Sequence, residues 1–138
     1  MKSYIYVVLL VFFQSANFSS AQDQSIQFSI INSAGYSIGV GSCGKPCKVY
    51  KKMNPMEEGL IKIPAGHSQI YIERNIYGAD PVAYQIDEKL INLPKDHMLV
   101  FVPNFGMLII SKGDLLSIDF RNPKSIKEYP KGRLQVLD

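Results

Sequence analysis

Short β-rich runs, each ended by a turn containing proline or glycine, are the feature that most limits how this chain can fold. Proline inside a helix removes a backbone hydrogen bond and clashes with the preceding turn, and no long window shows the apolar repeat of an amphipathic helix. Evenly spaced short strands are typical of β-sandwiches. The sequence therefore predicts an all-β fold, a single antiparallel β-sandwich of about eight short strands, immunoglobulin-like or jelly-roll-like. The prolines that interrupt the chain from residue 64 onward are Pro64, Pro81, Pro94, Pro103, Pro123 and Pro130.

The clearest pair of strands lies between Glu57 and Arg74. Leu60, Ile61 and Ile63 are apolar in the first run, a second β-rich run covers 67–73, and Pro64-Ala65-Gly66 joins the two. A short connector of this kind between two β-rich runs predicts a β-hairpin.

Other runs predict strands in different environments. The run His97–Val102 is almost continuously apolar, which predicts a buried central strand. Lysines on both sides of Val49 predict an edge strand over 48–52 that is protected by charge. Glycines within the run that contains Ile38 and Val40 predict a bulge or the close approach of another backbone. Further strands are expected at 25–32, 82–86, 89–93, 107–111, 115–120 and 134–137.

The first 21 residues have the features of a secretory signal peptide. Lys2 precedes an unbroken apolar run from Tyr4 to Phe13, and small residues lead up to Ala21. A membrane span needs about 20 apolar residues, so cleavage before Gln22 is expected, and no transmembrane segment in the mature chain. We therefore expect residues 1–21 to be removed and residues 22–138 to form one secreted domain, periplasmic or in the cell envelope if the source is bacterial.

Two cysteines, Cys43 and Cys47, remain after that cleavage. In an oxidising compartment their default state is a disulfide, here closing the small loop that contains Lys45. The alternative is an exported copper-binding protein in which Cys43 and Cys47 act with His67 and His97, since soft ligands favour Cu(I).

No local signature of a nucleophile, a paired acid and base, a phosphate-binding loop or a nucleic-acid module is present. Because Lys2 is the only charged residue of the expected signal peptide, cleavage lowers the formal charge from +3 to +2, which is too small for a general polyanion binder. The chain is therefore predicted not to be an enzyme, and no cofactor and no nucleic acid are expected.

The function favoured by the sequence is recognition of an extracellular protein or surface through loops. Three loops are candidates: 41–50, 75–81 and the basic segment 121–133, which could contact an anionic partner. A membrane-active protein is the other alternative, because 97–110 is unusually rich in apolar residues. The predicted contact residues are Lys45, Tyr50, Tyr77, Arg121, Lys124, Lys127, Lys131 and Arg133.

Overall fold

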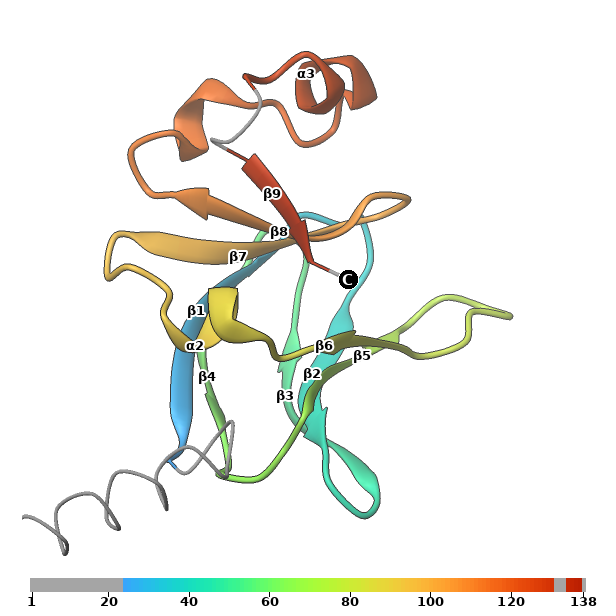
Figure 1. The fold of residues 1–138 in the computed structure, drawn as a ribbon. Helices are drawn as coiled ribbons and strands as arrows, with labels where there is room; N and C mark the ends of the chain where they lie inside the picture. Colours follow the sequence, from blue (N-terminus) through green and yellow to red (C-terminus); the bar gives the residue numbers. More distant parts are fainter. Residues whose placement is uncertain (1–23, 131–133, 138) are drawn as a thin grey trace, which may run out of the picture.

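Two open sheets packed face to face form the protein in the computed structural model, which describes residues 24–130 and 134–137 (Figure 1). The predicted sandwich is confirmed. The expected signal peptide and the contact residues Lys131 and Arg133 lie outside the described residues. In order across the first sheet, the strands are β4 (Glu58–Ile63), β1 (Ile26–Asn32), β7 (His97–Val102), β8 (Gly106–Ser111) and β9 (Leu134–Leu137); across the second they are β3 (Cys47–Met53), β2 (Ile38–Cys43), β5 (Gln69–Arg74) and β6 (Val82–Gln85).

Neighbouring strands are antiparallel except for β1 and β7, which pair in parallel. Between these two strands the chain crosses to the second sheet twice, for β2 and β3 and again for β5 and β6, with β4 of the first sheet in between. No short turn links β1 to β7, so the direction in which β7 enters is not restricted as it is within a hairpin.

The hairpin predicted between Glu57 and Arg74 is wrong, although both of its strands are present. β4 pairs with β1 in the first sheet, whereas β5 pairs with β2 and β6 in the second. The connector that begins at Pro64 therefore crosses from one sheet to the other. Each strand directs its buried isoleucines toward the same core from opposite sides, which a hairpin within one sheet could not do.

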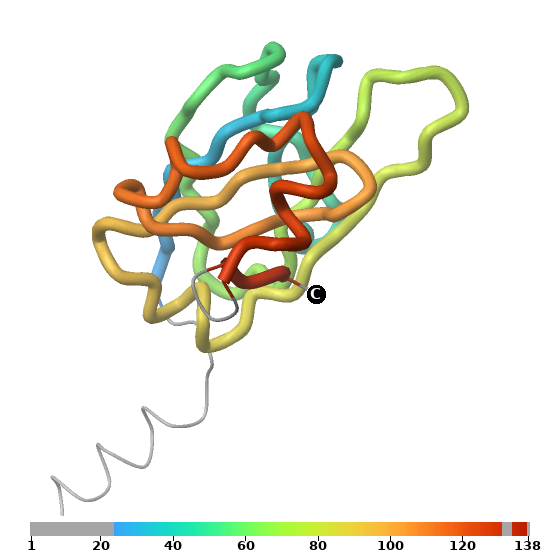
Figure 2. The backbone as a smooth tube through the Cα atoms, turned by 90° about the horizontal axis from the view of Figure 1, so that it is seen from above, coloured from blue at the N-terminus to red at the C-terminus, as the bar shows by residue number. Residues whose placement is uncertain are grey.

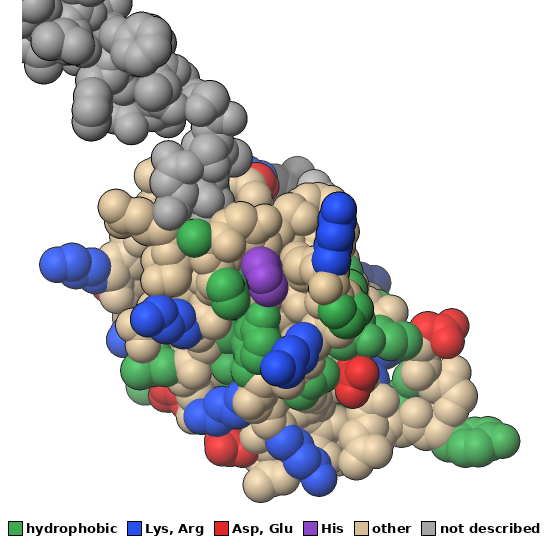
Figure 3. All heavy atoms as spheres, turned by 90° about the horizontal axis from the view of Figure 1, so that it is seen from below, with side chains coloured by type: hydrophobic (Ala, Val, Ile, Leu, Met, Phe, Trp, Pro, Cys, Tyr) green, Lys and Arg blue, Asp and Glu red, His purple; other side chains and the backbone are tan. Residues whose placement is uncertain are grey.

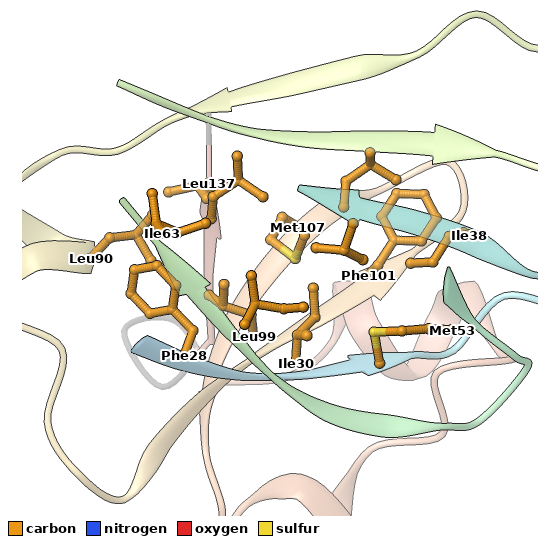
Figure 4. Packing of buried hydrophobic residues seen from close by; sticks show 14 of the residues in the cluster. Phe28, Ile30, Ile38, Met53, Ile63, Leu90, Leu99, Phe101, Met107 and Leu137 are labelled. Carbon is orange, nitrogen blue, oxygen red and sulfur yellow. The ribbon is translucent and has the colours of Figure 1, made fainter. Parts of the chain in front are cut away.

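Apolar side chains from both sheets meet in the space between them (Figure 4). One end of this core is filled by Leu90, which belongs to a short helix, α2 (Glu88–Ile91), where a strand was expected. Asp87 caps that helix: its Oδ1 accepts hydrogen bonds from the backbone N–H groups of Lys89 and Leu90. Labelled members of the core are Phe28, Ile30, Ile38, Met53, Ile63, Leu90, Leu99, Phe101, Met107 and Leu137.

Strands β7 and β8 are buried on both faces, which explains their nearly continuous apolar sequence. Their second face is covered by residues 115–130, which we call the cover (Figure 2). The cover contains a 3-10 helix, η1 (Leu115–Ser117), and a helix α3 (Pro123–Lys127), so the strand expected at 115–120 is wrong. Pro123 begins α3, where a missing backbone N–H is tolerated, and the Asn122 side chain caps it. Ile118 and Ile126 of the cover pack there against the strand residues Met98, Val100, Val102, Leu108 and Ile110.

The apolar residues that suggested membrane activity are therefore divided between two protein cores. Met98 and Val100 pack beneath the cover, and Leu99 and Phe101 pack between the sheets. Within the described residues, no helix is long and apolar enough to cross a membrane.

Strand β3 lies at an edge of its sheet, as its lysines predicted, and pairs with β2 through a β-bulge after Val40. A Cβ atom on Gly41 would lie 1.7 Å from the backbone oxygen of Lys48. Glycine is therefore required at this position, and the close approach predicted from the glycines of β2 is confirmed.

Candidate functional site

The three loops selected from the sequence lie at three different places on the sandwich. In Figure 1 the β2–β3 connector with the two cysteines projects at the bottom, the β5–β6 hairpin at the right, and the cover lies on top. The predicted contact residues therefore do not form one continuous surface, and each loop has to be considered separately.

Hydrogen bonds hold the β5–β6 hairpin at its base. Arg74 donates from Nε and Nη2 to the backbone oxygen of Asp80, at 3.2 and 2.7 Å. Asn75 donates from its backbone N–H to the Ser37 oxygen at 3.0 Å and from Nδ2 to Ser37 Oγ at 3.2 Å. These bonds fix both sides of the hairpin, so its tip is anchored to the sheet.

The tip itself is a tight turn that exposes Tyr77. The Ala79 N–H donates to the Ile76 oxygen at 3.3 Å, and Gly78 has a φ of 75°, which its missing side chain allows. Tyr77 occupies the outer corner of this turn, and its side chain is fully exposed; Ile76 beside it is partly exposed. An aromatic ring presented in this way can enter a partner's pocket with little loss of conformational freedom.

The disulfide between Cys43 and Cys47 is confirmed, with an S–S distance of 2.11 Å. It closes the loop that exposes Lys45. Beside the loop, Ser42 Oγ lies at hydrogen-bond distance from Tyr50 OH (2.6 Å) and from His67 Nδ1 (2.5 Å). Together these contacts connect the β2–β3 pair to the connector before β5.

Ser42 and His67 resemble a paired nucleophile and base, but Ser42 is buried, so in this conformation the pair holds the two segments together. Ser42 is completely buried, so a substrate cannot reach its hydroxyl. The remaining ring nitrogen of His67 lies under the loop, where a Cβ atom on Gly44 would be 2.7 Å from Nε2. Tyr50, predicted as a contact residue, remains partly exposed while its hydroxyl bonds to Ser42.

The four residues of the copper alternative are not brought together. Both thiols are used in the disulfide, and His97 lies at the start of β7 with its Nδ1 2.9 Å from Asp96 Oδ1. That hydrogen bond lowers the pKa of the Asp96 carboxyl below its ordinary value. Over residues 24–130 and 134–137, no three histidine, cysteine or acidic side chains gather where they could hold a metal ion.

The cover carries the described part of the basic segment and forms a cleft. Arg121 and Lys127 line a cavity of about 470 Å³ together with Phe105 and Phe120; Lys124 is exposed on the same helix. A second cavity of about 430 Å³ shares Ser33, Phe120 and Arg121 with the first. Its further lining is Ile31, Met56, Leu115, Leu116, Ile118 and Asp119.

The sequence analysis missed the apolar part of this cleft. In the sequence Leu115 and Leu116 look like part of a strand, and Met56 looks like part of a connector, so nothing local indicates that they line a cavity. Elsewhere the charges are dispersed: Figure 3 views the end with the disulfide loop and shows lysine and arginine side chains spread over that face.

Comparison of the chain with protein-family models, with curated proteins and with solved structures gives no match.

Proposed function

We propose that this protein is a non-enzymatic, exported recognition module that binds another protein by inserting Tyr77 into an apolar pocket of its partner. The observation that carries the proposal is the fully exposed tyrosine at the tip of a hairpin fixed at its base by Arg74 and Asn75. Tyrosine is among the residues that contribute most to binding at protein interfaces.

Export is supported by two independent features. The apolar run between Tyr4 and Phe13 follows a lysine and precedes small residues, as in a signal peptide. The bond between Cys43 and Cys47 is of a kind that persists in oxidising compartments and is rare in the cytosol.

A hairpin with a fixed backbone favours recognition because less conformational entropy is lost when the partner binds. The turn at Gly78 and the bonds from Arg74 hold the backbone in one conformation. Only the Tyr77 side chain has to become ordered on binding, which involves two rotatable bonds. A partner pocket that accepts an aromatic ring and offers a hydrogen-bond acceptor to its hydroxyl would fit this chemistry.

Photo-crosslinking from position 77 tests the proposal. A Tyr77→p-benzoylphenylalanine variant is exposed to extracellular fluid and cell-surface extracts of the source, with Leu116→p-benzoylphenylalanine as the matched control, since Leu116 is equally exposed at another site. We expect one protein to be cross-linked from position 77 and not from position 116.

The purified partner then allows a quantitative measurement. Tyr77→Ser should weaken its Kd by about 30-fold or more, corresponding to a loss of about 2 kcal/mol, while Leu116→Ser should leave the Kd unchanged. Because neither side chain contributes to the core, both variants should keep the wild-type Tm. Equal affinity of the Tyr77→Ser variant and the wild type would contradict the role of the hairpin.

A further inference from the structure

The cleft beneath the cover has two compartments that differ in chemistry. We call it the cover cleft and define it by the linings of the 470 and 430 Å³ cavities, which share Ser33, Phe120 and Arg121. Cavities of 300–1,000 Å³ are typical of small-molecule sites, and each compartment falls within that range. The cover cleft is separate from Tyr77, so ligand binding in the cleft is independent of the proposed function.

The 430 Å³ compartment is mainly apolar and has side chains that the core does not need. Leu116 is 96% exposed and Met56 is 54% exposed, yet both line the cavity next to the buried Ile118. Methionine is flexible and polarizable, which suits a surface that adapts to an apolar ligand. A ligand in this cavity would remove both exposed side chains from water.

Left-handed backbone conformations also occur at the cover cleft. Among the described residues, Met56 and Asn104 are the two non-glycine residues with positive φ, at 62° and 70°. Met56 lines the apolar compartment and Asn104 lines the other. A bulky side chain in the left-handed region is unfavourable, and strain of this kind clusters at ligand sites. Methionine at position 56 is therefore not explained by the stability of the fold.

The 470 Å³ compartment is cationic. Arg121 and Lys127 line it, and no acidic side chain does. Neither cation has an ion-pair partner among the residues that the structure describes. Asp119 lines the apolar compartment, where its Oδ1 accepts a hydrogen bond from the Arg121 backbone N–H at 3.1 Å. Arg121 lines both cavities and therefore lies at the boundary between the apolar and the cationic compartments.

We propose that the cover cleft binds a free fatty acid, with its chain along Ile31, Met56 and Leu116 and its carboxylate between Arg121 and Lys127. The planar guanidinium can bind both carboxylate oxygens, and a neighbouring lysine adds charge. The apolar cavity has the size of a single chain, so a free acid fits it better than a lipid with two chains.

Calorimetric titration of the full mature chain with dodecanoate, below its micelle concentration, tests the proposal. Saturable binding of one dodecanoate per chain is expected, with methyl dodecanoate binding more weakly because it lacks the charge. Arg121→Gln should weaken dodecanoate binding at least tenfold and leave binding of the ester unchanged. Leu116→Ser should weaken both ligands, and Tyr77→Ser, the control at the other site, should weaken neither.

A change at position 56 separates ligand binding from folding. Asparagine tolerates positive φ much better than methionine, so Met56→Asn should raise the Tm by a few degrees. The same change removes an apolar side chain from the cleft and should weaken dodecanoate binding at least fivefold. A variant that is more stable yet binds less cannot be explained by unfolding.

Several results would overturn the proposal. They are the absence of saturable binding, equal affinity of Arg121→Gln and the wild type for dodecanoate, or tighter binding of dodecyl phosphate than of dodecanoate. Binding to anionic vesicles without binding to monomeric dodecanoate would assign the cleft to a membrane surface instead. A change of oligomeric state without ligand uptake would assign it to a second copy of the chain.

Discussion

Truncation of Ile126 to alanine should destabilise the whole sandwich, because the cover and the sheet share one core. Ile126 is 6% exposed and packs with Ile118 against the outer face of β7 and β8. The change removes the equivalent of about three methylene groups, each contributing about 0.8 kcal/mol when buried. Incomplete collapse of the resulting cavity adds to this, so a total loss of about 2–4 kcal/mol in the free energy of unfolding is expected.

Urea unfolding followed by circular dichroism measures this loss, and a fall in Tm of roughly 10 °C should accompany it. The matched control is Leu116→Ala, an apolar truncation in the same cover at a position that is 96% exposed. It should change the free energy of unfolding by no more than about 0.5 kcal/mol.

Hydrogen exchange locates the effect. If the cover belongs to the cooperative core, Ile126→Ala lowers the protection of backbone amides in β7 and β8 as well as in α3. The reasoning would be refuted by an unchanged urea midpoint, or by a loss of protection confined to 115–130. Either result would show that β7 and β8 do not depend on the cover for burial.

Two further predictions concern the disulfide loop and the start of β7. Reduction of the Cys43–Cys47 bond should lower the free energy of unfolding by only about 2 kcal/mol, because the loop it closes is small. Urea unfolding with and without reductant measures this difference, and complete loss of the fold on adding reductant would contradict the prediction. His97 holds the pKa of Asp96 below its ordinary value of 3.8, so the contribution of the carboxylate to stability is present above its unfolded pKa and is lost as the pH falls through the lowered value. An NMR titration should place the midpoint of Asp96 below 3.8 in the wild type and closer to 3.8 in His97→Ala, and equal midpoints in the two proteins would contradict the assignment.

The strands were the most predictable part of the fold, because alternation and β-branched residues act over a few neighbouring positions. The run that contains Phe28 and Ile30 alternates as expected for a strand with one buried face. The continuous apolar run of β7 correctly indicated a central position. The lysines of β3 correctly indicated an edge.

Pairing was less predictable, because short connectors look alike whether they join strands of one sheet or two. The turn at Pro64 has the composition of a hairpin turn, yet it leads across the sandwich. The apolar residues at Leu115 and Leu116 look like a strand, but β8 already pairs with β7 and β9, so no edge is free on that side. The chain there folds over the sheet as the cover.

The candidate sites divide in the same way. Tyr77 and the two cysteines were identified from local sequence, since a loop tyrosine and a closely spaced cysteine pair are recognisable without a fold. The cover cleft could not be predicted, because Ile31 and Met56 are far in sequence from Leu116 and Arg121 of the cover, and the two groups meet only when the cover packs on the sheet.

The sequence by itself determined the strands other than those expected at 89–93 and 115–120, the disulfide and the exposed tyrosine, because each depends on residues a few positions apart. The tertiary structure decided which strands pair, that β1 and β7 run parallel, and that the cover encloses a cleft with one apolar and one cationic side. These features depend on contacts between distant segments, where burial of a shared apolar surface outweighs the preference of any single segment.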